Sequence, residues 1–265
     1  LFIFMGIMLE KSGLAESLLE TMAMMFGSVR GGLAISVVIV GALLAASTGI
    51  VGATVVTMGL ISLPTMLKRG YKTELATGVI ASSGTLGQII PPSIVLVLLA
   101  DTINSSSRGA ESVDVGALFS AALIPGMVLV VCYILYILII SYIRKEDAPA
   151  IPIEEIKAFR GDDFTSKIIK VLVLPILLIV LVLGSIFTGI ASPTEASAIG
   201  ALGATGLTLI QKKFSFKILQ EVAKETMKLT TMVFFILLGA TTFTLVFRSL
   251  GGDDYLQQLI LESDL

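Results

Sequence analysis

The chain has 265 residues, of which 55% are hydrophobic and only 14% are charged, and its formal net charge is −2. A soluble globular chain has roughly 45–50% apolar and about 25% charged residues, so this composition excludes an ordinary soluble domain and indicates a protein solvated by lipid. Histidine is absent and cysteine occurs once, at Cys132, which excludes histidine metal ligands, histidine proton relays and an intrachain disulfide. The small net charge gives no reason to expect a nucleic-acid partner.

The first predicted elements are the tail of a membrane helix and a helix lying on the membrane surface. Residues 1–9 form an uncharged apolar run. Residues 10–27 place apolar side chains at helical spacing with acids on the other face, which predicts an amphipathic interfacial arm, and we group both under residues 1–30. The chain starts and stops inside apolar or helical patterns rather than at natural boundaries, so we expect a piece of a longer protein, cut at both ends.

Two short apolar arms follow, at residues 31–46 and 50–67. Each has about 16 to 18 residues, or roughly 24–27 Å of helix, slightly less than a bilayer core of about 30 Å. The connection Ser47-Thr48-Gly49 carries no charge and no polar loop. Because two ordinary spanning helices need a watery connection, this turn predicts a re-entrant hairpin whose tip is buried in protein.

Residues 73–101 are predicted to form a membrane helix that is broken near its middle. Pro92 cannot donate a backbone hydrogen bond, and Pro91 is disfavoured from helical angles because a proline follows it. After a polar loop, residues 113–143 form an apolar run long enough to span the membrane. We group residues 31–143 as the first hairpin, the broken helix and the following spanning helix.

The second half is predicted to begin after an extramembrane loop at residues 144–166. This loop is rich in Lys and Arg, which places it in the cytoplasm. Residues 167–265 then read as the truncated start of a second repeat. Its predicted segments are spanning helices at 167–190 and 196–210, a basic amphipathic segment at 212–228, and a helix at 229–250. Glu195 lies next to Pro193 and is interpreted as a helix cap rather than a functional acid.

The beginning and the end of the chain contain similar sequences. Residues 1–6 and 14–19 resemble residues 234–239 and 255–260. The positive-inside rule directs the first copy inward and the second outward, and inverted repeats with broken helices are typical of secondary transporters. The predicted fold is an all-α membrane protein, a multi-helix bundle with inverted repeats, a re-entrant helical hairpin and broken transmembrane helices.

The hairpin tip and the broken helix are the candidate cation site. Hard cations prefer oxygen ligands, and interrupted helices expose carbonyl groups beside Ser and Thr hydroxyls. The candidate cation ligands are Ser47, Thr48, Gly49, Gly52, Ser82, Ser83, Gly84 and Thr85. Helix amino ends nearby attract an anionic substrate; the substrate-proximal candidates are Thr54, Gln88, Pro91, Pro92 and Ser93. The alternatives are close packing for any single Ser, Thr or Gly, and satisfaction of freed backbone groups for Gln88.

Four segments carry a resemblance to a known family. They are MGIMLEKSGLAESL at residues 5–18, ASTGIVGATVVTMGLISLPTMLKRGY at 46–71, SSGTLGQIIPPSIVLVL at 82–98 and GIASPTEASAIGALGA at 189–204. Together they resemble the large permease subunit, DctM-like, of tripartite ATP-independent periplasmic (TRAP) transporters. The resemblance covers essentially the whole chain, and the GTLGQIIPPS run is its most specific part.

The resemblance implies a multi-pass protein of the bacterial inner membrane that imports small organic acids with a sodium gradient by an elevator motion. It implies a small membrane subunit and a periplasmic binding protein as partners, beside membrane lipid. Sodium is then the coupling ion, with no other metal and no cofactor. Residues 47–49 would form the hairpin tip and residues 82–85 its partner at one sodium site, although the tip reads Ser-Thr-Gly where many members have a Ser-Gly-Ser type. The family's second hairpin is expected beyond Leu265.

Three other functions compete with organic-acid import. A non-transporting membrane scaffold or assembly subunit would have no reason to keep a broken helix at membrane depth. A carboxylate transporter of another family with the same hairpin architecture stays open on the sequence alone. An intramembrane enzyme would need a nucleophile–base pair or a metal set, and the sequence has neither histidine nor paired intramembrane carboxylates.

Overall fold

The computed structural model describes residues 1–48, 51–106, 113–159, 164 and 168–262, which contain helices and turns and no strand. The chain divides into two units, Leu1–Val222 and Ala223–Leu265. The all-α prediction is confirmed. In chain order the helices are α1 (Phe2–Lys11), α2 (Leu14–Phe26), α3 (Gly32–Thr48), α4 (Val51–Lys68), α5 (Thr73–Thr85), the 3₁₀ helix η1 (Leu86–Gln88), α6 (Ile94–Ser106), α7 (Val115–Ile143), α8 (Ile153–Phe159), the π-helix η2 (Ile169–Val173), α10 (Leu174–Phe187), α11 (Pro193–Ile210), α12 (Phe216–Ser249) and α13 (Gly252–Glu262).

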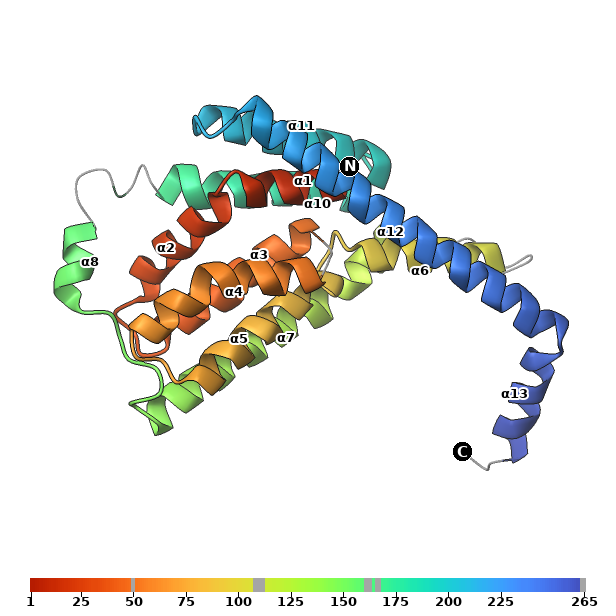
Figure 1. Ribbon diagram of the computed structural model, residues 1–265, viewed down its shortest axis with the longest axis horizontal. Coiled ribbons are helices and arrows are strands. Elements are labelled where there is room, and N and C mark those ends of the chain that lie inside the picture. Colours follow the sequence, from red (N-terminus) through yellow and green to blue (C-terminus); the bar gives the residue numbers. More distant parts are fainter. Residues whose placement is uncertain (49–50, 107–112, 160–163, 165–167, 263–265) are drawn as a thin grey trace. The chain divides into compact units, whose positions relative to one another are not determined.

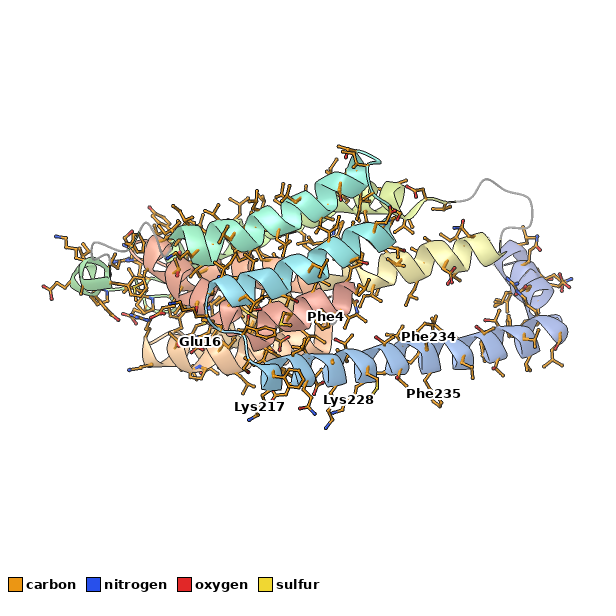
Figure 2. All side chains as sticks on the ribbon, turned by 90° about the horizontal axis from the view of Figure 1, so that it is seen from above. Phe4, Glu16, Lys217, Lys228, Phe234 and Phe235 are labelled. Carbon is orange, nitrogen blue, oxygen red and sulfur yellow. The ribbon has the colours of Figure 1, made fainter. Side chains whose placement is uncertain are left out.

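Three helical runs of the described chain are long and apolar enough to cross a membrane: Val115–Ile143, Ile169–Phe187 and Phe216–Ser249. Their apolar side chains are largely exposed, as expected where lipid rather than water surrounds the helix. Figure 2 shows two of them, Phe234 and Phe235 on α12, which are 66% and 77% exposed.

The core of the first unit is built around α3. Helix α3 packs against α1, α2, α4 and α5, and α1 also packs against α11 (Figure 1). The amphipathic helix predicted for residues 10–27 begins later, as α2, because residues 10 and 11 belong to α1. Helix α2 buries Leu14, Leu18 and Met22 along one face at intervals of four residues, and its position at the membrane surface stays a prediction. It is separated from α1 by a turn at Gly13, whose φ of 70° lies in the left-handed region that glycine tolerates best.

Lys213, in the loop between α11 and α12, forms hydrogen bonds with the turn between α1 and α2. Its Nζ donates hydrogen bonds to the Gly13 carbonyl, at 3.0 Å, and to the Ser17 hydroxyl, at 2.8 Å. About 200 residues separate the lysine from its partners along the chain. The contact therefore fixes the root of α2 to the loop between α11 and α12.

The prediction of two separate segments at 212–228 and 229–250 is wrong. The structure has a single helix, α12, with 34 residues. It contains no proline, and its polar first part is rich in Lys, Glu and Leu, which favour helix as strongly as the apolar part does. The change from polar to apolar composition marks a change of solvent along one helix rather than a helix end.

Residues 144–159, here called the strap, connect the ends of the first-unit helices. The Lys72 N–H donates to the Asp147 carbonyl at 3.1 Å, which joins the strap to the turn between α4 and α5. The Gly31 N–H donates to the Ala148 carbonyl at 3.1 Å, which joins it to the turn between α2 and α3. Ala148 is fully buried, so the strap is part of the core rather than a solvated linker.

An ion pair and an apolar contact hold the α8 end of the strap. Glu155 accepts two hydrogen bonds from the Arg69 guanidinium, at 2.8 and 3.1 Å, while the neighbouring Ile156 is buried. The hydrogen bonds from Arg69 lower the pKa of the Glu155 carboxyl below its ordinary value. The pair therefore stabilises the fold above that ordinary value, and its contribution is lost as the pH falls through the lowered pKa of the folded state.

Glu155→Gln should destabilise the protein slightly at neutral pH and not at all in acid. The Glu155 side chain is 49% exposed, so solvent screening limits the pair to about 0.2–1 kcal/mol. Melting temperatures of wild type and variant, measured from neutral pH downward, should converge below the ordinary carboxyl pKa of 4.5. A gap that widens toward acid would contradict this assignment.

Candidate functional site

The predicted break in residues 73–101 is confirmed, but it begins later than the sequence indicated. Helix α5 continues to Thr85, η1 follows, and α6 starts at Ile94. Residues 82–85 are thus the last turn of α5 rather than unwound backbone. Their carbonyl groups still lie at a helix end, where the partial negative charge of the helix favours a cation.

Two hydroxyl groups of this last turn donate to their own helix. Ser83 is fully buried and donates to the Ile80 carbonyl at 3.0 Å. Thr85 is exposed and donates to the Ser82 carbonyl at 2.8 Å. These bonds satisfy the hydroxyl protons, which leaves the hydroxyl oxygens as the groups able to face a cation.

The end of α5 is packed tightly against both arms of the hairpin. A Cβ atom on Gly84 would lie 2.3 Å from Val55 Cγ2 and 3.1 Å from the Val55 backbone nitrogen, so α4 approaches to backbone distance. A Cβ atom on Gly41 of α3 would lie 2.7 Å from Ser83 Cβ. The structure therefore brings residues 83 and 84 into direct contact with both arms. Neither Gly41 nor Val55 was singled out from the sequence.

The hairpin tip lies mostly outside the described residues. Ser47 and Thr48 belong to the last turn of α3, but their side chains and all of Gly49 are not among the residues that the structure describes. Gly52 lies exposed in the first turn of α4, and Thr54 is 2% exposed. The coordination assigned to the tip stays a prediction, while the two arms that carry it are helical, as expected.

The substrate-proximal candidates other than Thr54 are the exposed side chain of Gln88 and a buried turn before α6. Gln88 is exposed at the end of η1. Ser93 is 1% exposed; its hydroxyl donates to the Gln88 carbonyl at 2.8 Å and accepts from the Leu96 N–H at 3.5 Å. Ser93 therefore caps α6, while Pro91 and Pro92, joined by a cis peptide bond, are buried beside it.

Two further polar residues are placed by the structure. Glu195 forms a capping box with Ser192 at the start of α11, which confirms its interpretation as a cap. The Thr57 hydroxyl of α4 donates to Glu10 Oε1 of α1 at 2.7 Å. This second contact connects the hairpin to the helix before the surface arm, and no local sequence signal distinguishes Glu10 from the other acids of residues 10–27.

Comparison with known proteins identifies the family. The sequence model described as tripartite ATP-independent periplasmic transporter, DctM component, matches residues 1–265. The C4-dicarboxylate TRAP transporter large permease protein DctM of Pseudomonas aeruginosa is 32% identical over 91% of this chain and 53% of its own length. The ectoine TRAP transporter large permease protein TeaC of Halomonas elongata is 30% identical over 92% of the chain and 54% of its own.

A third relative extends the range of substrates. The sialic acid TRAP transporter large permease protein SiaM of Vibrio cholerae is 28% identical over 91% of the chain and 53% of its own length. The chain thus spans little more than half the length of these curated relatives, all of which are transporter permeases by name. With its apolar spanning helices, the chain belongs to the DctM component family of TRAP transporters and is a multi-pass protein of the inner membrane.

Proposed function

We propose that the full protein is the membrane subunit of a sodium-coupled importer of a small organic acid, which a periplasmic binding protein delivers and a small membrane subunit helps to move. The observation that carries this proposal is the contact of the α5 end with both hairpin arms, at Gly84–Val55 and Ser83–Gly41. The interrupted helix α5–α6 packs closely against the hairpin α3–α4. The bundle is otherwise largely apolar, and it contains in this region the carboxyl ends of α3 and α5 and the amino ends of α4 and α6.

The partial charges at these helix ends favour the binding of a cation at the carboxyl ends and of an anion at the amino ends. The carboxyl end of α5 at residues 82–85 favours a cation, and sodium accepts carbonyl and hydroxyl oxygen ligands without a carboxylate. The amino ends of α4 at Val51 and of α6 at Ile94 carry the partial positive charge of their helices, which favours an anionic substrate. The relatives named above for C4-dicarboxylates and sialic acid support an acid as the substrate class.

A non-transporting scaffold or assembly subunit is the alternative. A scaffold would be served equally well by continuous helices, whereas an interruption at membrane depth leaves backbone groups that need partners. The interruption between Thr85 and Ile94 therefore favours transport.

Sodium dependence is the decisive measurement. The full-length protein, reconstituted in liposomes with its small subunit and loaded binding protein, should accumulate the acid when sodium is high outside. Replacing sodium by choline or lithium should reduce uptake to the level seen without the binding protein. Uptake that is equal in all three salts would reject sodium coupling, and a correctly assembled complex without uptake of any tested acid would favour the scaffold.

A further inference from the structure

A continuous groove lies between α5 and α7 and reaches the candidate site described above only at Ser82. Its inner part is a cavity of about 260 Å³ lined by Gly78 and Ser82 of α5 and by Tyr133 of α7. Its outer part is a cavity of about 250 Å³ lined by charged residues at the starts of α5 and the strap. Both cavities share Glu74, Leu75 and Tyr136, so they form one channel-like surface, here called the α5–α7 groove.

The length of the groove matches one leaflet of a bilayer. From Lys72 to Ser82 it follows ten residues of chain along α5, or about 15 Å at 1.5 Å per residue. From Arg144 to Tyr133 it follows a similar length of α7. A bilayer core is about 30 Å thick, so a groove of this length reaches from the headgroup region to roughly the midplane.

The two ends of the groove differ in polarity. The outer end carries two cations, Lys72 and Arg144, and two anions, Glu74 and Asp147. Arg144 and Asp147 are only loosely paired, at 3.9 Å, and Lys72, Glu74 and Arg144 are exposed. Such a balanced set complements a zwitterion better than a single charge, because a phosphate and an ammonium group can each meet an opposite charge.

The inner end is lined mainly by apolar side chains. Leu75, Val79 and Ile137 line its walls. Gly78 is exposed and leaves the floor open, since no heavy atom of the described chain lies within 4 Å of the point where its Cβ would stand. Tyr136, which spans both parts, is 56% exposed. This surface suits a hydrocarbon chain that enters from the side of the membrane.

We propose that the α5–α7 groove binds one phospholipid of the cytoplasmic leaflet, with a headgroup of phosphate and primary ammonium, as in phosphatidylethanolamine. The phosphate lies between Lys72 and Arg144, and the ammonium group lies against Glu74 and Asp147. One acyl chain runs along Gly78 to Ser82. The end of this acyl chain contacts the last turn of α5, which also packs against the hairpin. A bound lipid therefore stabilises the position of that turn.

Photocrosslinking with a filled-groove variant tests the proposal. Gly78→Leu places a side chain in the open floor, and leucine is a better helix former than glycine, so the variant keeps its fold. Gly206→Leu in α11 is the matched control, because its Cβ also meets no heavy atom of the described chain within 4 Å and it does not line the groove. Full-length protein with its small subunit is reconstituted with phosphatidylethanolamine that carries a photoactivatable acyl chain, and labelled peptides are identified by mass spectrometry.

Labelling of the peptide with Tyr133 and Tyr136 is expected in wild type and in Gly206→Leu, and a loss of about tenfold is expected in Gly78→Leu. Undiminished labelling of Gly78→Leu would overturn the groove as the binding site. Equal labelling by a phosphatidylcholine probe, whose quaternary ammonium cannot donate hydrogen bonds, would overturn the headgroup assignment. A photoreactive amino acid at position 78 that links to a polypeptide instead of lipid would show that protein covers the groove.

Discussion

Gly84→Ala should abolish uptake by the full-length protein and lower its melting temperature. The added methyl group would lie 2.3 Å from Val55 Cγ2, closer than real Cβ atoms approach, and 3.1 Å from the Val55 backbone, which is a tight contact. Helices α4 and α5 must then separate, and overpacking of this kind costs about 1–3 kcal/mol. Because the displaced turn carries the proposed cation ligands, the loss of uptake should exceed what the loss of stability alone produces.

Two companion variants make the Gly84 experiment specific. Gly59→Ala adds the same methyl group to the facing helix α4, where no described heavy atom is within 4 Å, so stability should stay equal or rise. Val55→Ala removes the Cγ2 atom, and Val55→Ala combined with Gly84→Ala should recover part of the lost stability in a double-mutant cycle. If Gly84→Ala and Gly59→Ala behave alike in thermal unfolding and uptake, the close approach of α4 and α5 is not maintained in the membrane.

Lys213→Met should lower the melting temperature of the protein by several degrees. It removes two hydrogen bonds from a charged donor, at 3.0 Å to the Gly13 carbonyl and 2.8 Å to the Ser17 hydroxyl, and a hydrogen bond of a charged group contributes about 1.5–3 kcal/mol. The turn between α1 and α2 then loses its link to the loop after α11. Thermal unfolding of the purified full-length protein measures the loss directly.

The neighbouring lysine provides the control. Lys212 is exposed, so Lys212→Met should change stability by less than about 0.5 kcal/mol. Lys213→Arg keeps a charged donor and should restore part of the loss. Equal melting temperatures for the methionine variants at the two positions would show that the Lys213 contact contributes nothing to stability.

The sequence predicted those parts of the fold whose cause is local. The Pro91-Pro92 pair interrupts a helix wherever it stands, and Ser192 three residues before Glu195 specifies a capping box by spacing alone. The boundary expected at Leu229 was wrong because a change of polarity was read as a helix end, although helix propensity is continuous there. The division into repeats and the orientation of each copy stay predictions, since the two units are described separately.

The contacts around the candidate site residues could not be predicted from the sequence. Runs of Ser, Thr and Gly suggested a hairpin tip and a helix break at residues 82–85, but a sequence does not distinguish a glycine in close contact from one beside open space. Gly84 is in backbone contact with α4, whereas Gly78, two turns earlier on α5, faces open space. Lys213 contacts Gly13, 200 positions away, and Glu155 contacts Arg69, 86 positions away. The periodicity within a single helix cannot predict contacts between residues so far apart in the sequence.

The strap also has a consequence for the order of biosynthesis. Lys72 and Gly31 find their strap partners at Asp147 and Ala148, and Arg69 finds Glu155 86 residues later. A ribosome therefore finishes the hairpin, the broken helix and α7 before it makes the segment that joins their ends. Until then the turns at Gly31 and Lys72 lack these backbone partners. The first hairpin therefore enters the membrane without these hydrogen bonds, which form only after the residues that follow α7 have been synthesised.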